Sequence, residues 1–278
     1  MTEFLTLDGG TIAYEVTGEG PLVVLAHGMG NSREAYRFVV PPLVAAGYRV
    51  ASVDLRGCGE SSVVWKSYTR TDIAGDIIAL VRHLGGPAVL VGHSVSGGAV
   101  TIAAAQEPEL IAGIVELAPF TRKQSISLGG LLRVTRYRKG MLRLLGVGLL
   151  GSLPIWKSYL DVAFPGVKPA DWAAYLDRIG AMLSEPGRMK AVQQMGLSAP
   201  IDAGAQLGNV RCPALIVEGT LDPDWTDPRA EGEAIVADMP AGLARLAMVE
   251  GAGHYPHTQF PDQVVALVVA FLRENARA

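Results

Sequence analysis

One stretch decides the fold of this chain: Val89-Leu90-Val91-Gly92-His93-Ser94-Val95-Ser96-Gly97-Gly98. It begins with a compact apolar run, which is typical of a strand covered on both faces of a sheet. Small residues follow at once, so a helix can start after a sharp turn and pack closely against the strand. Such a turn exposes a hydroxyl at its tip, and we predict that Ser94 occupies that tip.

Ser94 is therefore the candidate nucleophile. Val95 would open the following helix, where its N–H has no intrahelical partner and can point at a developing oxyanion. The pattern departs from G-x-S-x-G because Ser96 stands at the second glycine position, a change that adds little bulk. Ser96 is a rival nucleophile, although that choice would carry the strand two residues too far. Taken alone, the stretch is also compatible with a glycine-rich turn without chemistry.

Further apolar runs extend the pattern on both sides of this turn. Two alternating runs at residues 3–7 and 11–17 predict a hairpin. Compact apolar runs lie at residues 22–26, 49–53, 88–91, 113–117, 214–217 and 244–249, with helix-length segments at 32–46, 71–84 and 96–106. This alternation predicts an α/β fold with a doubly wound, mostly parallel sheet.

The alternation stops between residues 121 and 198. The segments there read as helices, at residues 128–150, 155–164, 169–184 and 188–195, and prolines separate them. We expect residues 1–120 and 199–278 to form the core and residues 121–198 to form an all-helical insertion. Its basic run is interpreted as a solvated helix face, with recognition of a carboxylate or a membrane surface as the alternative. The run comprises Arg133, Arg136, Arg138, Lys139 and Arg143.

Composition limits the classes of function. With 49% hydrophobic and 18% charged residues, the chain of 278 residues can bury a large core. A net charge of −3 gives no support to nucleic-acid binding. Residues 84–106 have the length of a membrane span, but internal glycines and a proline divide them, so we expect no stable membrane insertion. The cysteine content, Cys58 and Cys212, and the absence of a targeting pattern favour a cytoplasmic protein.

A second segment, Leu25-Ala26-His27-Gly28-Met29-Gly30, follows another buried strand. Its glycines allow a backbone path that turns the N–H of Met29 toward the site, so Met29 and Val95 would together donate to the oxyanion. A plain glycine turn is the structural alternative. Residues 53–61 are expected to support the site, with Cys58 filling a tight turn.

The base is selected from five histidines. His83 lies in a helix pattern, and His27 and His93 lie on the turns that serve the oxyanion. His257 follows a proline and is expected at the rim. This leaves His254, which ends the last strand in a glycine turn, as the base that activates the hydroxyl.

The acid is expected in the loop after residues 214–217. A carboxylate there would fix the tautomer of the histidine and stabilise the imidazolium. Asp222 is favoured because it lies closest to the end of the strand. Asp224 is the runner-up, and Asp227 trails both. The order Ser, Asp, His along the chain is itself informative, because it differs between families of triad enzymes.

Together these segments resemble the α/β-hydrolase superfamily in the H-G turn, the D-x-R-G-x-G-x-S loop, the G-H-S elbow, the G-x-x-D loop and the terminal G-x-G-H-x-P. The resemblance implies Ser94 as nucleophile, Asp222 as acid, His254 as base and Met29 and Val95 as oxyanion donors. It implies that the insertion is a lid over the site, and it implies no cofactor and no metal. Haloalkane dehalogenases and epoxide hydrolases of this fold carry an aspartate at the elbow, so a serine there argues against both.

The resulting expectation is a serine hydrolase acting on a small to medium apolar carboxylic ester, thioester or lactone through an acyl-enzyme. We expect His27, Gly28 and His93, with Trp156 and Tyr159 from the lid, to bind this small-molecule substrate. A C–C bond hydrolase, lyase or cyclase with the same triad is one alternative. A hydrolase-like ligand-binding protein is another. The sequence leaves the oligomeric state open.

Overall fold

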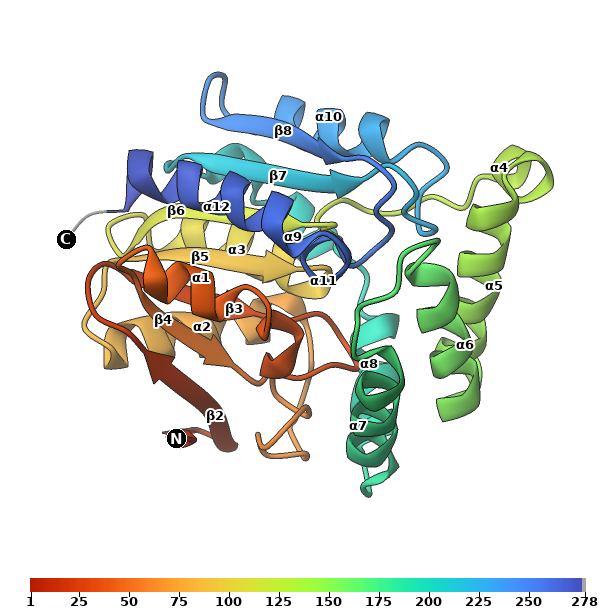
Figure 1. The fold of residues 1–278 in the computed structure, drawn as a ribbon, viewed down its shortest axis with the longest axis horizontal. Helices are drawn as coiled ribbons and strands as arrows, with labels where there is room; N and C mark the ends of the chain where they lie inside the picture. The colour runs from red at the N-terminus through yellow and green to blue at the C-terminus, as the bar shows by residue number, and fades with distance from the viewer. Residues whose placement is uncertain (277–278) are drawn as a thin grey trace.

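Eight strands form a single sheet in a computed structural model that describes residues 1–276 (Figure 1). Their order is β1-β2-β4-β3-β5-β6-β7-β8, with β2 antiparallel to both neighbours and every later pair parallel. The strands are β1 (Glu3–Leu7), β2 (Gly10–Thr17), β3 (Leu22–Ala26), β4 (Arg49–Val53), β5 (Ala88–His93), β6 (Ile111–Leu117), β7 (Ala214–Gly219) and β8 (Ala244–Val249). The predicted doubly wound, mostly parallel sheet is confirmed.

Helices cover both faces of this sheet. One face packs against α2 (Arg70–His83), α3 (Val95–Gln106) and α10 (Pro228–Asp238), and the other against α1 (Val40–Ala45) and α12 (Pro261–Asn275). Strand β3 is buried at every position, as its unbroken apolar run requires. The short helix α11 (Pro256–Gln259) leads into α12. Covering both faces leaves the carboxyl ends of the strands as the place where loops can gather a site.

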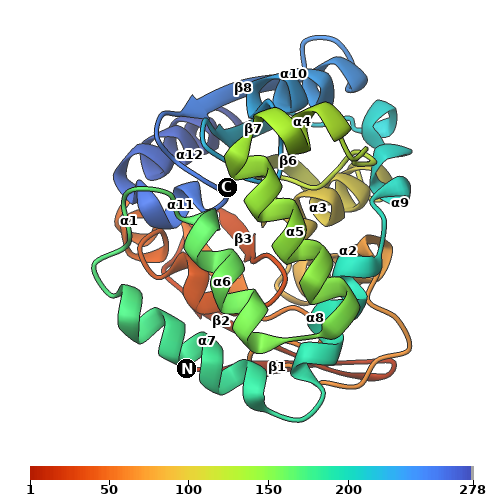
Figure 2. The same cartoon turned by 90° about the vertical axis from the view of Figure 1, so that its right-hand side faces the viewer.

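The chain between β6 and β7 is helical, and most of it lies beyond the carboxyl ends of the strands (Figure 2). Its helices are α4 (Leu128–Arg133), α5 (Thr135–Leu150), α6 (Leu153–Ala163), α7 (Trp172–Ser184), α8 (Arg188–Leu197), α9 (Ile201–Gly204) and the 3₁₀ turn η2 (Leu207–Asn209). A third apolar cluster joins this insertion to the core, because Met29 and Tyr255 pack among its buried side chains. No helix within residues 1–276 combines the length and apolarity needed to cross a membrane.

Two helices differ from their predictions. The helix expected at residues 128–150 is divided at Val134, whose extended backbone (φ −110°, ψ 98°) ends α4 and starts α5. The helix expected at 32–46 becomes the 3₁₀ turn η1 (Arg33–Tyr36) and the short α1. Pro41 and Pro42 explain the second break, since proline has no N–H to continue a helix but is well placed in a first turn.

Candidate active site

Ser94 lies at the sharp turn between β5 and α3. Its φ of 55° is in the left-handed region, which a serine adopts only when its surroundings impose it. Its N–H donates to Leu117 O at 3.0 Å, and its carbonyl accepts from the N–H groups of Gly97 and Phe120. A Cβ at Gly92 would collide with the Ser96 carbonyl, so only glycine permits this turn. The turn is therefore held in its strained form by both β6 and α3.

Three side chains meet at this turn in a hydrogen-bonded series. The Ser94 hydroxyl lies 3.0 Å from His254 Nε2, and His254 Nδ1 lies 2.8 Å from Asp222 Oδ2. The three residues come from loops after β5, β8 and β7, whose carboxyl ends lie near one another in the sheet. All three are buried, and Ser94 keeps 7% of its surface exposed. The arrangement has the contacts by which a hydroxyl is activated by an oriented imidazole.

Asp224 also approaches His254. Its Oδ2 lies 3.2 Å from His254 Nδ1 and accepts a 2.6 Å hydrogen bond from the Tyr159 hydroxyl. Its backbone N–H donates to Asp222 Oδ1 at 2.9 Å. The two acids considered from sequence are thus both brought to the same nitrogen, with Asp222 the nearer.

These charges shift the acid–base properties of the site. Burial lowers the pKa of His254, but the carboxylates of Asp222 and Asp224 outweigh it and raise that pKa to about 8. Burial, with the charge of Asp222, raises the pKa of Asp224 to about 7, although the imidazole and the Tyr159 hydrogen bond act in the opposite direction. Near neutral pH His254 and Asp224 therefore bind protons more tightly than they would in water.

Backbone donors for an oxyanion lie on either side of Ser94. Met29 and Val95 both line the cavity beside Ser94. Within residues 1–276, neither N–H donates to another protein group. Gly28 is required for this path, since a Cβ there would lie 2.6 Å from His93 Nδ1 and 3.0 Å from the Ser94 Cβ. The structure therefore brings the two expected donors to the cavity wall.

The other histidines near the turn position the backbone. His27 bonds Gly28 O through Nδ1 at 2.7 Å and accepts the Leu55 N–H at Nε2. His93 Nε2 lies 2.8 Å from the carbonyl of His254, which it bonds as a donor. Within residues 1–276, these two histidines and Gly28 are not among the residues that line the cavity beside Ser94. Their expected contact with substrate stays a prediction.

His257 is fully buried, so its expected place at the rim is wrong. Its ring stacks on Tyr36 with centroids 5.1 Å apart and meets His93 edge-on at 4.7 Å. Burial lowers the pKa of His257 to about 3, so the ring is neutral at physiological pH.

Cys58 is buried as expected, and burial raises the pKa of its thiol to about 12. A thiol with that pKa is a poor nucleophile.

A cavity of about 360 Å³ opens beside Ser94 and His254. Trp156 and Tyr159 line it as expected, and their rings stack with centroids 5.2 Å apart. Most of its wall is apolar and comes from the insertion, from Met141, Leu144, Leu145, Val147, Val192 and Met195. This volume lies near the lower end of the range for ligand pockets.

The sequence interpretation missed several cavity residues. Phe120, Lys123 and Gln124 line it, and all follow β6, where a loop at a strand's carboxyl end is a general signal for a site. Arg70 also lines it, with its guanidinium bonded to the carbonyls of Phe120 and Ser198.

In the basic run of the insertion, Arg136 and Arg143 bond Thr226 O and the Ser158 hydroxyl.

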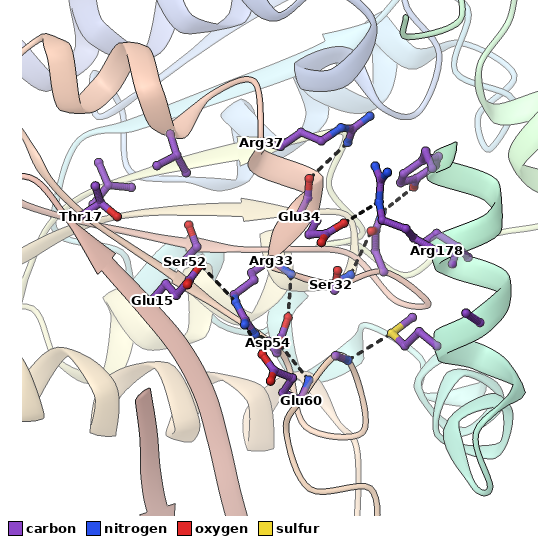
Figure 3. A pocket seen from close by; sticks show the side chains of 18 of the residues that line it. Glu15, Thr17, Ser32, Arg33, Glu34, Arg37, Ser52, Asp54, Glu60 and Arg178 are labelled. Carbon is purple, nitrogen blue, oxygen red and sulfur yellow. Dashed lines mark hydrogen bonds and ion pairs between the residues drawn. The ribbon is translucent and has the colours of Figure 1, made fainter. Parts of the chain in front are cut away.

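A larger cavity of about 780 Å³ lies elsewhere, between η1, the β2–β4 edge and α7 (Figure 3). Its arginines already have carboxylate partners. Arg33 contacts Asp54 and Glu60, and Arg178 lies 2.7 Å from Glu34 Oε2. Neither Ser94 nor His254 lines it. The smaller cavity is therefore the candidate substrate site.

Comparison with known proteins identifies the family of this chain. The model described as "Alpha/beta hydrolase family" matches residues 23–267. Epoxide hydrolase B of Mycobacterium tuberculosis is 37% identical over 116 residues, 40% of this chain and 33% of that protein. Polyketide synthase ThaQ of Burkholderia thailandensis is 30% identical over 285 residues, 99% of this chain and 13% of that protein. The chain thus spans a third or less of the length of these relatives.

The fold is also found in solved structures. An esterase from Exiguobacterium antarcticum superposes with a TM-score of 0.80 at 19% identity, over 98% of this chain and 100% of that one. At this level of identity the likeness concerns the fold.

Proposed function

The chain belongs to the alpha/beta hydrolase family, and from that premise we propose that it is a serine hydrolase with Ser94 as nucleophile, His254 as base and Asp222 as acid. The observation that carries the proposal is the pair of contacts from Ser94 to His254 (3.0 Å) and from His254 to Asp222 (2.8 Å). The strained backbone of Ser94 supports it, since such strain gathers at functional positions.

The proposed reaction proceeds through an acyl-enzyme. His254 takes the hydroxyl proton as Ser94 attacks the carbonyl carbon, and Asp222 stabilises the imidazolium. The N–H groups of Met29 and Val95 stabilise the oxyanion; loss of one such donor typically costs about 10²–10³ in rate. The imidazolium then protonates the leaving group, and a water activated by His254 releases the acid and restores Ser94.

We propose a small to medium apolar carboxylic ester, thioester or lactone as substrate. The apolar wall and the volume of about 360 Å³ support this class. Residues 121–198 are proposed to act as a lid, because they supply most of that wall. The likeness to epoxide hydrolase B leaves the proposal unchanged, since Ser94 stands where the family resemblance places an aspartate in epoxide hydrolases.

A fluorophosphonate probe, which labels activated serines, tests the nucleophile. Wild-type protein and Ser96→Ala should be labelled, and Ser94→Ala should not. Labelling that survives in Ser94→Ala would overturn the assignment. A panel of aryl and alkyl esters then tests the substrate class. If the protein is labelled but hydrolyses none of these esters, the proposed substrate class is wrong, whereas the assignment of Ser94 as nucleophile still holds.

A further inference from the structure

We propose that Asp224 and Tyr159 form a positioning pair that places a second carboxyl group against His254 and couples the basicity of His254 to the helical insertion. This inference rests on the proposed role of His254 as the base. It assigns a function to an acid that a triad does not require.

The position of Asp224 is fixed from several sides. Its backbone N–H donates to Asp222, and its carbonyl accepts a 2.6 Å hydrogen bond from Gln124 Nε2. Its Oδ2 faces both Tyr159 (2.6 Å) and His254 (3.2 Å), whereas its Oδ1 is buried without a hydrogen-bond partner among residues 1–276. A buried carboxyl oxygen left without a partner is costly, so this placement needs a compensating role.

Among the residues that the structure describes, His254 is the only cationic side chain in contact with the Asp224 carboxylate. The ionisable side chains gathered around His254 and Asp224 are Asp222, Glu218, Tyr159, Tyr255, His93 and His257. Burial keeps both of the latter histidines neutral by lowering their pKa values. Arg70 and Lys123 line the same cavity, but within residues 1–276 neither lies within 4.0 Å of an Asp224 oxygen. An ionised Asp224 therefore favours the imidazolium form of His254.

Tyr159 connects this charge to the insertion. It lies on α6, is 2% exposed and lines the cavity. A hydroxyl that donates to a carboxylate favours its ionised form. While α6 stays in place, Tyr159 therefore stabilises ionised Asp224, which in turn makes His254 more basic. Movement of α6 away from the core would remove that hydrogen bond and lower the basicity of His254.

The rate of fluorophosphonate labelling as a function of pH tests the pair without knowledge of the substrate. Labelling requires neutral His254, so its rate rises as pH passes the pKa of that group. Asp224→Asn should move this rise to lower pH by about one unit, because it removes a charge, and Tyr159→Phe should move it in the same direction by less. The double variant should move it no further than Asp224→Asn alone, because Tyr159 acts through Asp224.

Tyr175→Phe is the matched control. Tyr175 is another buried tyrosine of the insertion, and its hydroxyl bonds Asn31 away from the triad. This variant should lose stability without moving the pH of the rise. An unchanged profile in Asp224→Asn, or equal shifts in Tyr159→Phe and Tyr175→Phe, would overturn the pair.

The outcomes also separate this inference from the proposed function. Labelling retained in Ser94→Ala removes the proposed function and the pair with it. Labelling lost in Ser94→Ala but with an unchanged profile in Asp224→Asn removes the pair alone. If Asp224→Asn fails to fold, Tyr159→Phe carries the test, because it removes one oxygen and leaves the ring packing in place.

Discussion

The Ser96 hydroxyl donates a 2.6 Å hydrogen bond to the backbone carbonyl of His27. This bond joins the two turns that carry the proposed oxyanion donors, since Ser96 follows Val95 and His27 precedes Met29 by two residues. Ser96, which replaces the second glycine of the G-x-S-x-G pattern, therefore links the two turns by a hydrogen bond. Its side chain is fully buried and bonded, which argues against its own use as the nucleophile.

Ser96→Ala should weaken the alignment of the two turns that carry the proposed oxyanion donors. We expect a loss of about 0.5–1.5 kcal/mol in the free energy of unfolding for the lost hydrogen bond. Labelling by a fluorophosphonate should slow by up to about 10²-fold, the lower end of the cost of a lost oxyanion donor. Ser96→Gly restores the G-x-S-x-G pattern and should nevertheless label no faster than Ser96→Ala.

Ser127→Ala is the control for Ser96→Ala. Ser127 caps α4 by accepting the Gly130 N–H at 3.0 Å, far along the chain from the two oxyanion turns. Its loss should cost a similar free energy, about 1 kcal/mol, at an unchanged labelling rate. Equal labelling by Ser96→Ala and wild-type protein would show that the oxyanion turns hold their alignment without the bond.

The raised pKa of His254 predicts a pH dependence of stability. Its folded value is about 8 against a usual 6.5. The folded state therefore binds this proton more tightly than the unfolded state does. The resulting stabilisation, about 2 kcal/mol, is fully present below pH 6.5 and is lost as pH rises to 8. Urea denaturation of His254→Gln and wild-type protein should differ more at pH 6 than at pH 9. A constant difference would contradict the raised pKa.

The sequence predicted most of the sheet and the meeting of Ser94, His254 and Asp222. Both follow from general rules: unbroken apolar runs are buried strands, and loops at the carboxyl ends of neighbouring parallel strands converge. The proximity of these three side chains follows because β5, β6, β7 and β8 lie next to one another in the sheet and their carboxyl ends meet at one edge.

The remaining features depend on packing between distant segments. The burial of His257 results from its stacking on Tyr36, more than two hundred residues earlier, and no local pattern encodes that contact. The approach of Asp224 to His254 depends on how the loop after β7 folds back, with its N–H on Asp222 and its carboxyl on Tyr159. Because the sequence does not show these contacts, it does not reveal that Asp224 as well as Asp222 reaches His254.

Gly30→Ala should distort the proposed substrate cavity. A Cβ at this position would lie 2.6 Å from Cζ2 of Trp156, and the backbone φ is +66°. The left-handed backbone costs about 1–2 kcal/mol for alanine, and displacement of the indole about 1–3 kcal/mol more. Because Trp156 lines the cavity, turnover of the larger esters in the panel should fall before that of the smaller ones.

Gly166→Ala separates the two costs of Gly30→Ala. Gly166 has the same φ of +66°, but a Cβ there would meet nothing within 4 Å. Urea denaturation should therefore show only the backbone cost, and ester preference should stay unchanged. Equal destabilisation of the two variants would mean that displacing the Trp156 indole costs no measurable free energy of unfolding.

Asp171 ties the insertion to the core through Arg37 and also bonds Arg178 within the insertion. It accepts from Arg37 Nε at 2.9 Å and Nη2 at 2.6 Å, and from Arg178 Nη2 at 2.7 Å. Arg37 follows η1 in the core, whereas Arg178 lies on α7. These groups are partly exposed, so Asp171→Asn should lower the free energy of unfolding by less than about 1 kcal/mol. Hydrogen exchange of α7 should nevertheless accelerate, because the bonds with Arg37 cross the junction, and 1 M salt should reduce the difference from wild type.

Asp161→Asn is the matched control for this junction. Asp161 pairs with Lys168 Nζ at 2.9 Å within the insertion and makes no bond to the core in residues 1–276. Its loss removes an ion pair of similar length, so exchange in α7 should stay at the wild-type rate. If both variants accelerate exchange equally, the ion pairs act only on the insertion itself. If only Asp171→Asn does, Asp171 holds α7 against the core through Arg37.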